Sequence, residues 1–437
     1  MRFEWKTTTL GAVCEAQGGA IQTGPFGSQL HTSDYKRVGI PVVMPTNLGE
    51  SGIDEAGIAR IDSFDVERLS QHKLRVGDIV FSRRGDVTKS ALVRPHEVGW
   101  LCGTGCLKVR LGNEATAAAK FISYYLRLPE TKEWLIRHAV GATMPNLNTG
   151  ILSAVPINLP PLKVQLYIAA ILGAFDDRIA LLRKTNVTLE AITQSLFKSW
   201  FFDFDPVHAK SKGLKPQGMD DANAVLFSDG FEESVYGVVP KGWMWRHLSD
   251  ISTIVMGLSP KGDSYNDVGV GVPLINGPVE FGEYFPVRTK WTDSASRLSK
   301  TGDLIFCVRG STTGRRVISD GEYCIGRGVC AIRSLHDAPT FIYQTINFGL
   351  ERLLAKTTGS VFPSLSAPDI KGLVVLSPPL DVVGAFEKIA NPLLQKVQSD
   401  QRQIQTLIQL RDTLLPRLIS GQLRLPEAEE LVEEACA

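Results

Sequence analysis

The chain contains two copies of one sequence, and this duplication restricts its fold more than any single motif does. The phrase GDIVFSRRGDVTKSALV at residues 77–93 returns as GDLIFCVRGSTTGRRVI at residues 302–318. Further along, residues 141–202 align with residues 359–420 without a gap. Because 437 residues are too many for one hydrophobic core, we expect two copies of one architecture.

The two copies differ in their connections. Leu10 aligns with Leu248, Gly77 with Gly302 and Phe121 with Phe341, and the separation between aligned residues shrinks at each step until it becomes constant. The second copy has therefore lost residues only from the loops of its first part. Shared elements with different loops are typical of a scaffold whose loops carry different specificities.

The first part of each copy, about residues 1–160 and 242–378, consists of short β-branched runs separated by Gly, Pro and Asn. Helical patterns are few there, at residues 116–128 and 340–354. This pattern predicts a mostly β module of the α+β class in each copy. Residues 203–241 are rich in Gly, Pro and polar residues, which is typical of a linker between the copies.

Each copy ends in a long helical pattern that follows a proline pair, LPPL in the first copy and SPPL in the second. Apolar residues alternate there in steps of four and three, as in the a/d seam of a coiled coil. A helix over residues 162–200 would be about 58 Å long at 1.5 Å per residue, which a small β module cannot cover. We therefore predict that the two helices form an antiparallel coiled coil, so that the modules repeat about a pseudo-twofold axis. The alternative is that each helix packs on its own module.

The apolar residues of the predicted seam are Leu172, Phe175, Ile179, Leu182, Leu189, Leu196, Leu393, Val397, Ile404, Leu407 and Leu414. Polar residues also occupy the seam, at Asn186, Thr193, Asp400 and Arg411. Polar seam residues weaken a coiled coil, but they can fix its register.

Motifs and charge exclude several classes of protein. The chain has no Gly-x-x-x-x-Gly-Lys phosphate loop, no HExxH and no GxSxG motif, and we assign no catalytic residue. Its net charge of +1 means that any nucleic-acid contact must come from local patches. The seven cysteines form no CxxC pair, so we expect no metal site and buried free thiols at Cys102, Cys106, Cys324 and Cys330.

Apolar residues are distributed as in a globular protein. No run of 18 or more apolar residues occurs, so we expect no membrane span and no membrane partner. The sequence MRFEWKTTTLGAV at the start of the chain lacks the charged-then-apolar pattern of a secretion signal, so we expect a cytoplasmic protein.

The repeated phrase places a cation at the end of a predicted buried strand in both copies. Three pairs align at this turn: Arg84 with Arg309, Gly85 with Gly310, and Thr88 with Thr313. Arg83, in contrast, aligns with Val308. A cation beside a glycine, where backbone can approach a ligand closely, suits a phosphate group, and phosphate contacts need not differ between the copies. The alternative is that Arg84 pairs with Asp78 or with another local carboxylate.

The chain resembles the specificity subunits of Type I restriction–modification systems over essentially its whole length. The resemblance rests on RVGDIVFSRRG and KTGDLIFCVRG, on the turns GATMPNL and GSVFPSL, and on the two Pro-Pro-Leu helix starts. The helix exits LFKSWFFDFDPVHAK and LRDTLLPRLISGQL are the most specific. Helix starts of the family usually read Pro-Pro-Leu-x-x-Gln. Gln165 fits this pattern, but Val383 replaces the glutamine in the second copy, which puts its role there in doubt.

The resemblance implies a non-catalytic reader of double-stranded DNA with one half of a bipartite, asymmetric site bound by each module. It also implies two modification subunits, which methylate adenine with S-adenosylmethionine, and two restriction subunits, which translocate and cut DNA. S-adenosylmethionine, ATP and Mg²⁺ are then expected in those partners, with no cofactor bound by this chain. The implied domains are target-recognition domain 1 (1–160), helical spacer 1 (161–202), the linker (203–241), target-recognition domain 2 (242–378), helical spacer 2 (379–420) and a tail (421–437).

We expect base readout in the segments that vary most between the copies, residues 18–36, 86–89, 255–267 and 311–315. Asn146 and Asn148 could read adenine edges in the major groove, although a turn-capping role is an equal alternative. Candidate DNA contacts are Ser28, Lys36, Arg83, Arg84, Thr88, Lys89, Asn146, Asn148, Lys261, Arg309, Thr313, Arg315 and Arg316.

Two other functions remain open at this point. One is a multifunctional restriction–methylation enzyme with unrecognised catalytic residues. The other is a coiled-coil scaffold that does not bind DNA.

Overall fold

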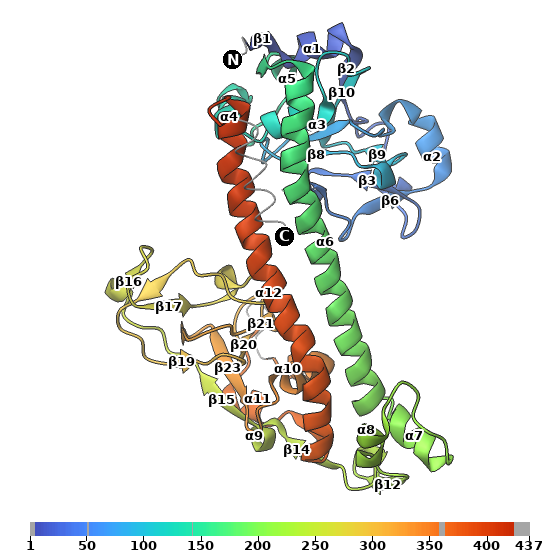
Figure 1. The fold of residues 1–437 in the computed structure, drawn as a ribbon, viewed down its shortest axis with the longest axis vertical. Coiled ribbons are helices and arrows are strands. Elements are labelled where there is room, and N and C mark those ends of the chain that lie inside the picture. The colour runs from blue at the N-terminus through green and yellow to red at the C-terminus, as the bar shows by residue number, and fades with distance from the viewer. Residues whose placement is uncertain (1–4, 50–51, 142, 358–362, 424–437) are drawn as a thin grey trace. The chain divides into compact units, whose positions relative to one another are not determined.

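The computed structural model describes residues 5–49, 52–141, 143–357 and 363–423. The chain divides into two compact units, Met1–Leu181 with Ile404–Ala437, and Leu182–Gln403. Each unit contains one β-rich module and a part of each long helix, as the colours of Figure 1 show. The α+β class and the internal repeat predicted from the sequence are confirmed.

The module of the first unit is built on a four-stranded antiparallel sheet in the order β2-β10-β7-β8. Its strands are β2 (Gly18–Thr23), β10 (Cys106–Gly112), β7 (Ile79–Ser82) and β8 (Ser90–Leu92). A second sheet has the order β6-β3-β9, with β6 (Ala59–Ile61), β3 (Ile40–Val43) and β9 (Leu101–Cys102). Short pairs join β1 (Lys6–Thr9) to β11 (Pro156–Leu159) and β4 (Leu48–Gly49) to β5 (Gly52–Ile53). Its helices are α1 (Leu10–Ala16), α2 (Ser63–Arg68), α3 (Ala119–Tyr125), α4 (Pro129–His138) and α5 (Thr149–Ser153).

The module of the second unit repeats this plan. Its four-stranded sheet has the order β15-β23-β20-β21, with β15 (Ser252–Met256), β23 (Val329–Ser334), β20 (Leu304–Cys307) and β21 (Arg316–Ile318). The second sheet has five strands in the order β16 (Tyr265–Asn266), β18 (Trp291–Thr292), β17 (Val272–Ile275), β22 (Tyr323–Ile325) and β19 (Leu298–Ser299). β14 (Met244–His247) pairs with β24 (Val374–Ser377), as β1 does with β11. The helices are α9 (Leu248–Ile251), α10 (Pro339–Leu354) and α11 (Ala367–Lys371).

The segment between the copies, which we expected to be a linker, contains secondary structure. It forms α7 (Asp205–Ser211), α8 (Asp221–Leu226) and the hairpin of β12 (Phe231–Ser234) and β13 (Gly237–Pro240). Val207, Phe227 and Val239 are each buried and belong to or adjoin the aromatic core of the second unit. These three side chains give an otherwise Gly- and polar-rich segment enough buried apolar surface to fold.

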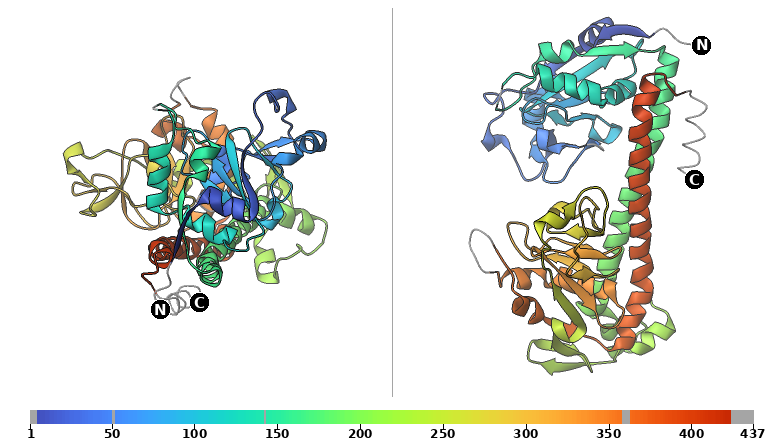
Figure 2. Two further views of the ribbon diagram at one scale, coloured as in Figure 1. Left: turned by 90° about the horizontal axis from the view of Figure 1, so that it is seen from above. Right: turned by 90° about the vertical axis from the view of Figure 1, so that its left-hand side faces the viewer.

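Two long helices, α6 (Leu162–Phe201) and α12 (Leu380–Ile419), each span 40 residues. In the first unit, Arg411 of α12 donates to Asp176 of α6. In the second unit, Trp200 of α6 meets Phe386 of α12, with ring centroids 6.2 Å apart. A late residue of one helix meets an early residue of the other, so within each unit the helices run antiparallel, as Figure 2 shows.

Most of the predicted seam is buried in this helix pair. Leu172, Phe175, Ile179, Leu182, Val397, Ile404, Leu407 and Leu414 are at most 4% exposed, whereas Leu189, Leu196 and Leu393 are half-buried. Near the end of α6, Phe197 replaces Leu196 as the buried residue. Phe197 packs against Phe341 and Phe348 of α10, with ring centroids 5.7 and 5.1 Å away, and the next seam residue, Trp200, is again buried.

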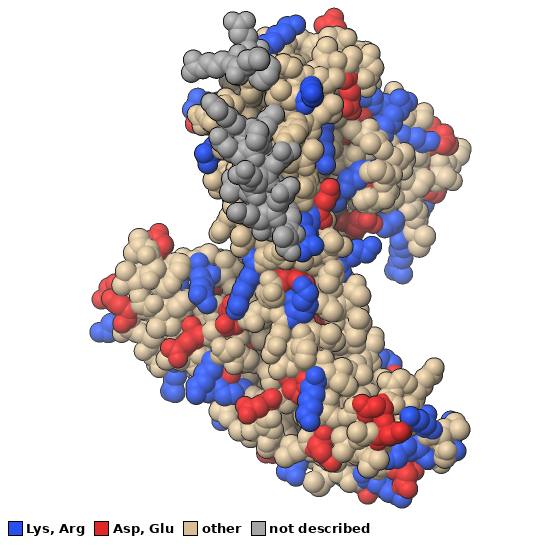
Figure 3. Space-filling view, viewed as in Figure 1, with Lys and Arg blue, Asp and Glu red and all other residues tan. Residues whose placement is uncertain are grey.

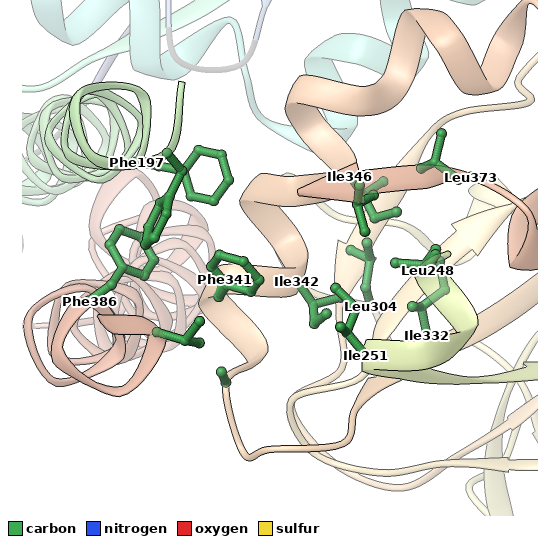
Figure 4. Packing of buried hydrophobic residues seen from close by; sticks show 14 of the residues in the cluster. Phe197, Leu248, Ile251, Leu304, Ile332, Phe341, Ile342, Ile346, Leu373 and Phe386 are labelled. Carbon is green, nitrogen blue, oxygen red and sulfur yellow. The ribbon is translucent and has the colours of Figure 1, made fainter. Parts of the chain in front are cut away.

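Aromatic side chains join the helix pair to the module in the second unit. Figure 4 shows Phe197 of α6, Phe386 of α12 and Phe341 of α10 facing one another. Phe197 lies 5.7 Å from each of the other two rings, centroid to centroid. The cluster continues into the sheet through Leu304 and Ile332. Aromatic pairs at this separation add to the free energy gained by burial alone.

Two expectations from the sequence concerned buried free thiols and the absence of a membrane-spanning helix. Cys102, Cys106, Cys324 and Cys330 are buried free thiols, as predicted, and burial raises the pKa of Cys102 and Cys330 to about 12. Among the residues that the structure describes, no helix is both long and apolar enough to cross a membrane.

Candidate nucleic-acid interface

The two modules build the same turn after the strands β7 and β20. Arg84 and Arg309 follow these strands, and Gly85 and Gly310 adopt positive φ angles of 78° and 87°. Such angles favour glycine, because a side chain in the left-handed region is strained. The hydroxyl of Ser82 donates to the carbonyl of Arg84 over 2.9 Å, and the Cys307 thiol contacts the carbonyl of Arg309 at 3.4 Å. The backbone of each arginine is therefore fixed by the strand end before it.

A second segment holds each turn from the other side. The N–H of Gly85 donates to the carbonyl of Pro145 over 3.1 Å, and the N–H of Leu147 donates to the carbonyl of Arg83 over 2.9 Å. In the second module, the equivalent bonds join Gly310 to Pro363 over 3.0 Å and Leu365 to Val308 over 2.9 Å. The motifs GATMPNL and GSVFPSL thus position the arginine turns, a link that the sequence alone did not show. Ala142 and residues 359–362 of these motifs lie outside the described residues.

Arg84 and Arg309 are exposed, and neither forms an ion pair with a described residue. The expected alternative, a pair of Arg84 with Asp78, is wrong because Arg110 binds Asp78 with two hydrogen bonds of 2.7 and 2.6 Å. In the second module Arg333 binds Asp303 in the same way, over 2.8 and 2.7 Å.

Both carboxylates of these pairs are 1% exposed, and each also accepts a backbone N–H. The arginine that pairs with a buried carboxylate therefore lies on β10 in the first module and on β23 in the second. Arg110 and Arg333 lie in segments that align between the copies, and this alignment is the sequence signal from which their pairing with Asp78 and Asp303 could have been found. The arginine at the glycine turn is left free to meet a ligand.

Arg83 differs from its counterpart Val308 in its surroundings. The Arg83 guanidinium lies over the ring of Phe26, 6.0 Å from the centroid, and its Nε is buried without a hydrogen-bond partner among the described residues. Phe26 is 56% exposed, so this cation–π pair lies at the surface. Val308 is fully buried. The first module therefore has a cation over an aromatic ring at this position, where the second has a buried valine.

The two threonines of the turns are engaged within the protein. The Thr88 hydroxyl donates to Asp86 over 2.6 Å, and this bond lowers the pKa of the Asp86 carboxyl. The Thr313 hydroxyl donates to the carbonyls of Gly310 and Pro363, over 2.8 and 2.9 Å. Both hydroxyls therefore stabilise the turn beside the arginine.

Arg315 and Arg316 have different environments. Arg315 is exposed, whereas Arg316 is half-buried in β21 and donates to Asn347 and to the carbonyl of Gly314. Burial lowers the pKa of Arg316. The side chain of Arg316 is thus held by the module, and only Arg315 of this pair is available at the surface.

The asparagines of the first module also contact the protein. Asn148 is the N-cap of α5, where its side-chain oxygen accepts the N–H of Ile151 over 2.8 Å, and Ser366 caps α11 in the second module. The side-chain oxygen of Asn146 is buried without a hydrogen-bond partner among the described residues. The turn-capping alternative therefore describes Asn148 in this structure.

The remaining predicted contacts lie at the surface of the variable loops. Ser28, Lys36, Lys89 and Lys261 are all exposed. Lys36 donates to the carbonyl of Ser33 over 3.1 Å. On the face shown in Figure 3, basic and acidic side chains are interspersed and do not form one basic area. This face therefore offers single basic side chains, and no extended basic surface.

A side chain of a long helix clamps the start of one helix in each module, α3 in the first and α10 in the second. Gln165 of α6 is fully buried; its oxygen accepts the N–H of Ala118 over 3.0 Å, and its amide donates to the carbonyls of Thr116 and Pro160. The bond from Ala118 satisfies an N–H at the start of α3 that has no partner within the helix.

In the second unit, Glu387 of α12 replaces Gln165. Its carboxylate accepts the N–H groups of Thr340 and Phe341, each over 3.1 Å, at the start of α10. Burial raises the pKa of Glu387. The positive end of the α10 dipole, which lies at the start of that helix, favours the charged form of the carboxylate. Val383, the aligned residue, lies one helical turn earlier. In the second copy, where Val383 replaces the glutamine of the Pro-Pro-Leu-x-x-Gln pattern, Glu387 on the same helix face therefore holds the start of α10 instead.

Comparison with known proteins agrees with this geometry. The family model of the Type I restriction modification DNA specificity domain matches residues 3–191 and again residues 240–407. The type I restriction enzyme MjaIX specificity subunit of Methanocaldococcus jannaschii is 27% identical over 320 residues, which cover 71% of this chain and 70% of that protein. The type I restriction enzyme HindI specificity subunit of Haemophilus influenzae is 25% identical over 367 residues, covering 70% and 77%.

A solved structure shares the fold. The crystal structure of the Type-I restriction-modification system S subunit from M. genitalium aligns with a TM-score of 0.56 at 16% identity, covering 95% of this chain and 96% of that chain. The family model matches well over half of the chain, in two segments that each contain one β-rich module and most of one long helix. The chain therefore belongs to the Type I restriction modification DNA specificity domain family.

Proposed function

We propose that this chain is the sequence-specific DNA-recognition subunit of a Type I restriction–modification complex. Each module would bind one half of an asymmetric bipartite site. One observation carries the proposal: the same turn presents an exposed arginine without an ion-pair partner among the described residues in both modules, Arg84 and Arg309, while the loops around it differ. Shared cations suit phosphates, which are the same in every sequence, and different loops suit different bases.

The exposed groups divide the proposed interface into two roles. Arg84 and Arg309 contact phosphates and set the position of each module on the duplex. Base contacts come from the variable loops and their neighbours, namely Ser28, Lys36, Arg83, Lys89, Lys261 and Arg315. Thr88, Thr313, Asn148 and Arg316 make side-chain hydrogen bonds inside the module, whereas the side-chain oxygen of Asn146 is buried without a partner among the described residues. The proposed target-recognition domains comprise residues 1–160 and 242–378, and the helical spacers comprise residues 161–202 and 379–420.

Catalysis is proposed for partner subunits. Two modification subunits would methylate adenine with S-adenosylmethionine, and two restriction subunits would use ATP and Mg²⁺ to translocate and cut DNA. This division is supported by the relatives, which are specificity subunits, and by the lack of phosphate-loop and hydrolase motifs in the sequence.

Reconstitution tests the proposal. The chain is assembled with the modification subunits of a Type I system, binding to duplex DNA is measured, and methylated adenines are mapped by sequencing. We expect tighter binding than by the modification subunits alone and methylation at one bipartite motif with two unlike halves. Binding no tighter than by the partner subunits would favour a scaffold. Methylation or cleavage of DNA by the purified chain alone would establish a multifunctional enzyme.

A further inference from the structure

The seam of the helix pair contains a polar layer in the second unit. Trp200 of α6 contacts Phe386 of α12. Two heptads, or fourteen residues, back from Trp200 lies Asn186, and fourteen residues forward from Phe386 lies Asp400. In an antiparallel pair these two positions occupy the same layer. Asn186 is 1% exposed and Asp400 is 0% exposed.

This layer is incompletely hydrogen-bonded. Lys396 binds one carboxylate oxygen of Asp400 from the preceding helical turn. The other oxygen of Asp400 and both polar atoms of the Asn186 side chain are buried without a partner among the described residues. A buried polar group without a partner destabilises a fold, so an apolar layer here would give a more stable helix pair. Polar seam residues are nevertheless used where they select one pairing over another.

The sequence repeat shows which pairings compete. In the gap-free alignment of the two helical regions, Asn186 aligns with Ile404 and Asp400 aligns with Leu182. If α6 paired with α6 of a second chain, Leu182 of that chain would take the place of Asp400 opposite Asn186. If α12 paired with α12 of a second chain, Ile404 would take the place of Asn186 opposite Asp400. Twofold symmetry would produce each mixed layer twice.

We propose that Asn186 and Asp400 select the partner of each long helix, favouring α6 with α12 over like helices from two chains. In the α6–α12 pair, the amide donor of Asn186 and the carboxylate acceptor of Asp400 belong to one layer. In a pair of like helices each polar group faces an apolar side chain that can neither donate nor accept. The duplication gives the chain two similar seams, and this layer disfavours the pairing of like helices from two copies.

Refolding of mixed full-length chains tests the selection. Two batches carry a donor or an acceptor fluorophore, are unfolded together, refolded, and examined by energy transfer and sedimentation. The test variant is Asn186→Leu with Asp400→Leu. The control is Leu189→Ile with Val397→Leu, which changes a neighbouring layer of the same unit and keeps the polar one.

We expect the wild type and the control to refold as single chains. The double leucine variant should associate through like helices, with an association constant about a hundredfold higher, at about tenfold for each of two mixed layers removed. An exchange variant, Asn186→Asp with Asp400→Asn, keeps one donor and acceptor in the layer and should behave as the wild type does.

Each alternative outcome is decisive. Equal association of the double leucine variant and the control, or association of the exchange variant, would show that this layer does not select the pairing. Single variants give a second measurement. Asn186→Leu and Asp400→Leu should each lower the unfolding midpoint below those of both the wild type and the double variant. Additive midpoints would show that the two residues do not act as a pair.

Discussion

Replacing Arg84 and Arg309 by glutamine removes the two cations that the modules share. Both side chains are exposed and lack ion-pair partners among the described residues, so the substitutions break no salt bridge there. The turns are held by backbone groups, such as the carbonyl of Arg84 that accepts the Ser82 hydroxyl. We therefore expect folding stability to stay within about 0.5 kcal/mol of the wild type, as for ordinary surface substitutions.

The effect on DNA binding can be worked out from counterion release. Each phosphate neutralised by a protein cation contributes about 0.9 to the slope of log K against log salt concentration. A fourfold rise in salt, from about 50 to about 200 mM, thus weakens binding about 3.5-fold for each such contact. The double glutamine variant should bind more weakly at low salt, and its slope should be smaller by about 1.8.

The assay is fluorescence anisotropy of a labelled, random-sequence duplex titrated with the assembled complex at several salt concentrations. A random sequence isolates the phosphate contribution, which does not depend on the bases. Arg137→Gln is the matched control, because Arg137 is an exposed arginine of the same module with a 68% exposed side chain and pairs with Glu133 on α4. Its slope should equal that of the wild type.

An unchanged slope in the double glutamine variant would refute the phosphate assignment. A change in the methylated sequence, with the slope unchanged, would mean that one of these arginines reads a base.

Three further predictions concern stability. Burial raises the pKa of Asp176, but Arg127 and Arg411 outweigh it and hold that pKa below its usual range, so Asp176 stabilises the fold above about pH 4 and less as the pH falls through the lowered pKa. Asp176→Asn should therefore cost roughly 2 to 4 kcal/mol at pH 7 in urea unfolding, and the difference should shrink below about pH 4. Gln165→Ala leaves a buried backbone N–H without a partner and should cost about 1 to 3 kcal/mol, measured by thermal unfolding. Gly85→Ala meets no atom within 4 Å but places a side chain at a φ of +78°, so it should cost about 1 to 2 kcal/mol in the same assay.

Each of these predictions has a contrary result. A pH-independent difference between wild type and Asp176→Asn would show that the carboxylate is not the stabilising group. Equal melting temperatures for Gln165→Ala and the wild type would exclude the clamp. Gly85→Asn is the control for the turn, since asparagine tolerates the left-handed region better than alanine does, and equal losses for both variants would contradict the backbone argument.

The fold was largely predictable because its signals are periodic and repeated. Heptad spacing marked α6 and α12, and the alignment of the copies marked the strands that surround each arginine turn. The secondary structure of segment 203–241 was not predicted because Val207, Phe227 and Val239 follow no period, and their burial depends on packing against other elements. Tertiary packing of this kind is not visible in local composition.

The candidate site was predictable only in part. The turn and its arginine were found from the repeat, but the partner of Asp78 was not, because Arg110 lies 32 residues away on another strand. Glu387 was missed because it does not align with Gln165, although it lies one turn beyond Val383 on the same helix face. Contacts between segments that are distant in sequence can be recognised only once the fold is known.

The clamps at the helix starts also limit how such modules can be shuffled by recombination. A crossover at the Pro-Pro-Leu junction would join the second module to α6, which offers Gln165 and has Ala169 where α12 has Glu387. The N–H groups of Thr340 and Phe341 would then lose the carboxylate that they bind. A breakpoint about two turns into the helix, after Glu387, transfers the module together with its clamp. The inheritable unit is therefore the module with the first two turns of its helix.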